Sequence, residues 1–196
     1  GDGTVTWNYS VANSATQYLA ANQTVQEKFT VYINDGHGGV ASQVITVTVT
    51  GTNDAAVITG TATDSVTEAS GVLNGTPGDA LASGDLNATD VDNSAAFVVQ
   101  SGVAKTYGTF SIDATGAWSY TLDDTNTLVQ GLNTGGTLHE LVTVATADGT
   151  TQVIDVTIHG ANDAAVITGT ATDSVTEATA GNGGGTPTAI GDLNST

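Results

Sequence analysis

The chain has 196 residues, of which 20 are acidic and only 2 are Lys or Arg, so its formal net charge is -18 at pH 7. This charge excludes a nucleic-acid binder, which needs a basic surface, and it disfavours binding to an anionic membrane. The lack of Cys excludes disulfides and thiolate metal sites, and because no apolar run approaches the roughly 20 residues of a membrane-spanning helix, membrane insertion is not expected.

Alternation of β-branched and polar residues predicts strands along the whole chain. Residues 44–50 read VITVTVT and residues 153–158 read VIDVTI, the two-residue period of a strand with one buried and one solvated face. Disorder, which high net charge and few aromatic residues would favour, does not produce such runs. In the central part of the chain we expect strands at residues 55–62, 65–69, 84–89, 95–100, 106–112, 117–122, 138–147 and 151–159.

An internal repeat predicts the domain organisation. NDAAVITGTATDSVTEA, residues 53–69, recurs unchanged as residues 162–178, an offset of 109 residues. This period is too long for a solenoid and suits β-sandwich domains of about 100 residues in tandem. We therefore expect the C-terminal part of one repeat in residues 1–51, a complete repeat in 52–160 and the N-terminal part of a following repeat in 161–196.

The aromatic residues of the complete repeat lie on shared strand faces. Trp118 and Tyr120 share one face of the strand expected at 117–122, and Phe110 and Ile112 share one face of the strand before it. The simplest interpretation buries these side chains between two sheets. The alternative is an exposed platform on which a glycan stacks, and the exposure of Trp118 distinguishes the two.

Acidic residues gather in the expected turns and junctions rather than along strand faces. Asp90 and Asp92, one residue apart in a loop, are close enough to hold one cation. Hard oxygen ligands in a chain without Cys favour Ca²⁺ over Zn²⁺ or copper, and the 6–8 oxygens that Ca²⁺ takes require several loops. For each carboxylate the alternative is a solvated surface charge.

The order of the motifs resembles a cadherin repeat and, more closely, the bacterial VCBS repeat, a cadherin-like module of giant secreted adhesins and RTX-type exoproteins. Residues 86–92 (LNATDVD) resemble the DxD segment, 122–124 (LDD) the LDRE motif and 162–166 (NDAAV) the DxNDNAP linker of cadherins. The VCBS pattern of a YGT strand, a WxY strand and a late DG turn is similar to residues 107–109, 118–120 and 148–149.

This resemblance implies an all-β, Ig-like or cadherin-like Greek-key β-sandwich in tandem repeats, with Ca²⁺ held at the junctions between repeats. The implied ligands at the first junction are Asn53, Asp54, Asp90, Asp92 and Asp148. Those at the second junction are Asn162, Asp163, Glu68, Asp123 and Asp124. Because the Arg and Glu of LDRE are absent after Asp123, one ion per junction is expected rather than the three of cadherins.

The implied function is a calcium-stiffened spacer in a secreted or cell-surface bacterial adhesin that acts in adhesion or biofilm formation, with neighbouring repeats of the same chain as partners. The alternative is a repeat that itself binds a glycan or a protein on a target surface. No GxSxG or HExxH motif occurs, and we do not expect an enzyme. The partial repeats at the two ends are expected to complete each other by strand complementation, within one chain or between molecules.

Overall fold

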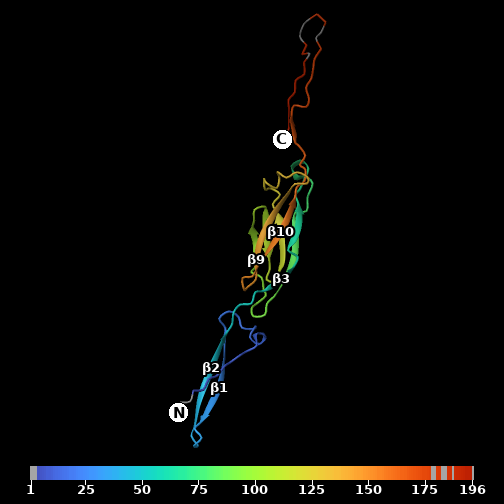
Figure 1. The fold of residues 1–196 in the computed structure, drawn as a ribbon. Helices are drawn as coiled ribbons and strands as arrows, with labels where there is room; N and C mark the ends of the chain where they lie inside the picture. The colour runs from blue at the N-terminus through green and yellow to red at the C-terminus, as the bar shows by residue number, and fades with distance from the viewer. Residues whose placement is uncertain (1–3, 178–179, 182–184, 187, 196) are drawn as a thin grey trace.

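Three parts follow one another along an elongated molecule (Figure 1). The structure, a computed structural model, describes residues 4–177, 180–181, 185–186 and 188–195. A hairpin of β1 (Thr24–Asn34) and β2 (Val40–Thr50) precedes the central sandwich, and a small hairpin of β11 (Ile167–Gly169) and β12 (Leu193–Ser195) follows it. The helical segments in the described residues are two short 3₁₀ turns, Asn13–Ala15 and Val72–Asn74, and no helix there is long and apolar enough to cross a membrane.

The central sandwich consists of two sheets. One sheet has the strand order β4-β10-β9 and the other β3-β5-β8-β7-β6. The strand β4 runs parallel to β10, whereas the other paired strands of the sandwich are antiparallel. The bounds are β3 Val57–Gly60, β4 Thr63–Thr67, β5 Leu81–Thr89, β6 Gln100–Ala104, β7 Gly108–Ile112, β8 Ala117–Leu122, β9 Thr137–Ala145 and β10 Thr151–His159. The prediction of an all-β sandwich is therefore confirmed.

The core lies between the two sheets and includes the predicted aromatic residues. Trp118 is only 3% exposed, stacks on Phe110 with ring centroids 6.3 Å apart, and donates its indole N–H to the carbonyl of Thr61 at 2.8 Å. A side chain at Gly84, opposite Trp118 on β5, would begin 2.6 Å from the indole ring, so this position requires glycine. Trp118 is thus a core residue, and the interpretation of this side chain as a glycan platform is wrong.

The prediction of a strand at residues 95–100 is wrong, because this segment crosses from one sheet to the other. The N–H of Val98 donates to the carbonyl of Ala145, and the carbonyl of Ala96 accepts from the N–H of Ala147, so the segment first contacts the end of β9. The chain then joins the other sheet as β6, which pairs with β7 in an irregular register. The alternation of polar and apolar residues in a short segment cannot reveal such a crossing, because the crossing depends on tertiary contacts.

Candidate functional site

The first acidic cluster lies where the chain enters the sandwich, around the turn between β9 and β10. Asp148 in this turn accepts hydrogen bonds from the N–H groups of Ala56 and Thr150, both at 3.0 Å, and from the hydroxyls of Thr146 and Thr150. The amide of Asn53 donates to the same carboxylate at 3.4 Å. The hydroxyl and N–H donors hold the pKa of Asp148 well below its usual range, so this carboxylate is charged at neutral pH.

The loop after β5 completes this cluster. Asp90 accepts hydrogen bonds at 2.9 Å from the N–H groups of Asp92 and Asn93, which fold the loop around its Oδ1 atom. The Asp92 carboxylate then accepts from the N–H of Asp54 at 3.1 Å, and the Asn93 amide donates to Asn53 Oδ1 at 2.7 Å. These hydrogen bonds connect Asn53, Asp92 and Asp148, include Asp54 through its main-chain N–H only, and add Asn93, which directly follows Asp92 in the sequence. Ligation of Ca²⁺ by the five predicted residues stays a prediction.

One oxygen of this cluster has no partner in the protein. Asp90 Oδ2 is buried and accepts no hydrogen bond. The N–H groups of Asp92 and Asn93 keep the pKa of Asp90 low, whereas the nearby charge of Asp148 acts to raise it. A charged carboxylate with one unpartnered buried oxygen beside a second carboxylate is an arrangement that a cation would stabilise.

The second acidic cluster lies where the chain leaves the sandwich. Glu68, only 1% exposed, accepts a hydrogen bond through Oε1 from the N–H of Ala161 at 2.7 Å, while its Oε2 is buried without a partner. Burial raises the pKa of Glu68, and the negative charges of Asp163 and Asp124 raise it further. This end of the sandwich thus carries a buried carboxylate with two acidic neighbours.

The two adjacent acidic residues after β8 differ in their roles. Asp124 accepts from the N–H of Ala69 at 3.2 Å, next to Glu68. Asp123 instead folds back on Thr125, whose N–H and hydroxyl donate to it at 2.9 and 2.6 Å. Asn162, the last residue predicted for this junction, is exposed, and its side chain donates to the Asp163 carbonyl. The cluster therefore forms around Glu68, Asp124 and Asp163, and ligation of Ca²⁺ by these residues, by Asp123 or by Asn162 stays a prediction.

The donor sets of both ends fit a hard cation. Each end offers carboxylate, amide and main-chain oxygens, and each contains one buried carboxylate oxygen that no protein group satisfies. Across the described parts of the chain, no three carboxylate or imidazole groups are arranged as a ready metal cage. An ion at either end would therefore need amide and carbonyl oxygens as well as carboxylates, which is the mixed ligand set that Ca²⁺ accepts.

Replacing Glu68 by Gln is expected to stabilise the protein in the presence of a chelator. Because the pKa of Glu68 in the folded state is raised above its ordinary value of 4.5, the charged form opposes folding increasingly as pH rises above that value. The variant should therefore be more stable than the parent at pH 7, while Gln can still accept the hydrogen bond from Ala161. Urea denaturation at pH 4 and pH 7 measures this gain, which should shrink at the lower pH.

The matched control is Glu27→Gln, which removes one negative charge from an exposed position on β1. This variant should change the free energy of unfolding by less than about 0.5 kcal/mol at either pH. A Glu68→Gln protein that is less stable than the parent at pH 7 in chelator would contradict the account of an unsatisfied buried charge.

Comparison with known proteins identifies the family of the chain. The model of the bacterial cadherin-like domain family matches residues 53–160, which are more than half of the chain and include every strand of the central sandwich. The comparison with curated proteins found no match. Among solved structures, PcdhgB3 EC1-4 in 50 mM HEPES is similar to this chain, with 18% sequence identity and a TM-score of 0.33. The match covers 75% of this chain and 35% of that chain, so the present chain spans about a third of the length of the solved protein. Cadherin-like domains are extracellular or cell-surface repeats of the adhesion type. By the family match over residues 53–160, the chain belongs to the bacterial cadherin-like domain family.

Proposed function

We propose that the chain is an extender segment of a large secreted or cell-surface bacterial adhesin of the VCBS or RTX type, stiffened by Ca²⁺ and serving adhesion or biofilm formation. One observation carries this proposal: acidic clusters lie at both ends of the sandwich, where the chain enters and where it leaves. A site for a small-molecule substrate would not need two such clusters at opposite ends.

Each cluster joins the sandwich to a linker. At the entry, Asn53, Asp54 and Ala56 of the linker donate hydrogen bonds to carboxylates of the sandwich at 3.0–3.4 Å. At the exit, the N–H of Gly71 donates to the Asn162 carbonyl at 3.4 Å, and the N–H of Ala164 donates to the Gly71 carbonyl at 3.2 Å. These hydrogen bonds are few, and the proposal is that without a metal ion they leave the angles between linkers and sandwich only weakly constrained.

Charge repulsion explains why stiffness would depend on a metal. With a formal charge of -18, the chain lacks the cations needed to balance its clustered carboxylates. Ca²⁺, when bound, would neutralise part of this charge and share oxygen ligands between sandwich and linker. A row of such junctions would hold a terminal binding domain far from the cell surface.

The alternative function, a repeat that itself binds a glycan, receives no support from Trp118. That side chain lies in the core and its indole N–H is already bonded to Thr61. The spacer function therefore has the stronger support.

Small-angle X-ray scattering tests the proposed function. Curves are recorded on the monomer peak of a size-exclusion column, with chelator and with Ca²⁺ in excess of the protein. We expect the interatomic distance distribution to sharpen and lengthen with Ca²⁺, and Asp90→Asn/Asp92→Asn to show a smaller change. Asp155→Asn, which removes a charge from the middle of β10, is the matched control and should behave like the parent. Superimposable parent curves in the two conditions would overturn the proposal.

A further inference from the structure

The segment that enters the sandwich and the strand that leaves it lie side by side and run in the same direction. In the parallel ladder of β4 and β10, five residue pairs are in register, the first being Thr63 with Asp155. The N–H of Asp155 also donates to the Ala62 carbonyl at 2.9 Å, and the N–H of Glu68 donates to the His159 carbonyl at 3.1 Å. The two segments are therefore joined from the start of β4 to the end of β10.

The strands β3 and β4 form one path that crosses from one sheet to the other without turning back. β5 runs antiparallel to both, since it pairs with β3 and since Asp79, shortly before it, forms an antiparallel bridge with Thr67 at the end of β4. At the crossing, Thr61 donates its N–H to the Asp85 carbonyl and accepts the indole N–H of Trp118, both at 2.8 Å. This path therefore leads from the entry end of the sandwich to its exit end and is bonded to both sheets.

Tension along the chain would pull β4 and β10 past each other. The linker that precedes β3 and the linker that follows β10 lie at opposite ends of the sandwich (Figure 1). A load on the two linkers therefore pulls β4 toward the entry end and β10 toward the exit end, along the strands. Because the hydrogen bonds of a ladder lie across the strands, this load acts on all of them together.

The inner face of the same ladder is shielded from water. Val66 of β4 is 1% exposed, and Val156 and Ile158 of β10 are fully buried. A slip of one residue would turn the inward side chains of a strand toward solvent, so the pairs must all break before new ones can form. Sliding therefore has to expose core surface as well as break hydrogen bonds.

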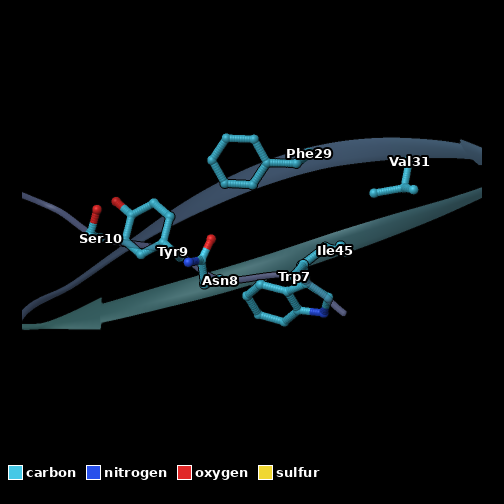
Figure 2. A pocket seen from close by; sticks show the side chains of 7 residues that line it. All are labelled: Trp7, Asn8, Tyr9, Ser10, Phe29, Val31 and Ile45. Atoms are coloured by element: carbon cyan, nitrogen blue, oxygen red, sulfur yellow. The ribbon is translucent and has the colours of Figure 1, made fainter. Parts of the chain in front are cut away.

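The β1–β2 hairpin illustrates the opposite geometry. Its two strands, on which Phe29 lies opposite Ile45, run in opposite directions (Figure 2). In an antiparallel pair that is joined by a turn, the two free ends are neighbours. A load on those ends opens the pairs one at a time, so that each hydrogen bond resists alone. The parallel pairing of β4 with β10 avoids this arrangement in the sandwich.

We propose that the β4–β10 ladder is a shear clamp, which keeps the sandwich folded when tension acts between the preceding and the following linker. The inference rests on the proposed function for the source of the load, because an extender transmits the force that acts on a terminal binding domain. The clamp itself consists of main-chain hydrogen bonds and core side chains and needs no metal. Measured in chelator, it therefore stands or fails independently of stiffening by Ca²⁺.

Single-molecule force spectroscopy in chelator tests the clamp by changing only the direction of the load. The chain has no Cys, so two introduced Cys residues define the points of attachment. Thr52→Cys/Ala165→Cys, at exposed positions, loads the two linkers, whereas Leu73→Cys/Ala165→Cys loads the exit ends of both strands. The first pair should unfold the sandwich in one step at up to about five times the force of the second, because five register pairs share the load.

Two matched substitutions locate the clamp within the sandwich. Val66→Ala and Val144→Ala remove the same atoms from positions that are each 1% exposed, but only Val66 lies in the β4–β10 ladder. Both variants should lower the urea midpoint to a similar extent. Only Val66→Ala should lower the force of unfolding between attachments at 52 and 165, while Val144→Ala keeps the force of the parent.

Two results would overturn the proposal. One is an unfolding force that is the same for the two attachment geometries. The other is a Val144→Ala chain that loses as much resistance to force as the Val66→Ala chain.

Discussion

Each bound Ca²⁺ ion is expected to raise the free energy of unfolding of the sandwich by about 3–4 kcal/mol when the free Ca²⁺ concentration exceeds the dissociation constant of that site 100- to 1,000-fold. The reason is that the clusters around Asp90 and Glu68 exist only in the folded chain, so that an ion bound there stabilises that state by mass action. Urea denaturation in chelator and at two Ca²⁺ concentrations, followed by tryptophan fluorescence, measures this effect. The urea concentration at the midpoint of unfolding should rise with each tenfold increase in the free Ca²⁺ concentration.

Two controls make the result specific to the acidic ends. Asp155→Asn, on the outer face of β10, should keep the full increase, whereas Asp90→Asn/Asp92→Asn should lose a large part of it. Mg²⁺ at the same concentration should stabilise less, because it requires a nearly ideal octahedron of ligands. Unfolding midpoints that are identical in chelator and in excess Ca²⁺ would refute the presence of these sites.

Trp118→Ala is expected to lower the free energy of unfolding by about 3–5 kcal/mol. The substitution removes the largest side chain of the core, leaves a cavity beside Phe110 and leaves the Thr61 carbonyl without its indole donor. Trp7→Ala changes the same residue type in the matching WxY motif, yet it should cost less than about 0.5 kcal/mol because Trp7 is exposed.

The comparison is made by urea denaturation at a protein concentration low enough to keep the chain monomeric. Each variant retains one tryptophan, and the fluorescence of the remaining residue reports the environment directly: Trp118 should emit at shorter wavelength than Trp7. Equal losses of stability in the two variants would contradict the difference in burial between the hairpin and the sandwich.

The strands that alternation predicts well are those bounded by turn residues. The strands predicted at residues 117–122 and 151–159 have the same first and last residues as β8 and β10. The prediction is accurate because turn sequences bound these strands and one face of each is buried. The prediction of a strand at residues 95–100 failed because Phe97 is buried in the core while the chain passes from one sheet to the other. β5 begins at Leu81 rather than at residue 84, since its pairing with β8 extends the strand.

The acidic clusters show what a sequence can and cannot establish. Asp90, Asp92 and Asp148 were predictable because each lies in a short turn beside a strand end, and the resemblance to cadherin repeats connects them with the Asn53-Asp54 linker. Which of two adjacent carboxylates faces Glu68 was not predictable, since this depends on loop geometry. The Thr residue two positions after Asp123 is a signal for a local turn that occupies Asp123 and leaves Asp124 for the cluster.

Isothermal titration calorimetry with Ca²⁺ tests the central claim most directly, namely that the carboxylates at the two ends of the sandwich bind calcium. The account predicts uptake of one ion at each end by the parent chain. Asp90→Asn/Asp92→Asn should lose the ion at the entry and Glu68→Gln/Asp124→Asn the ion at the exit, while Asp155→Asn keeps both. A parent chain that takes up no Ca²⁺, or variants that bind as many ions as the parent, would contradict it.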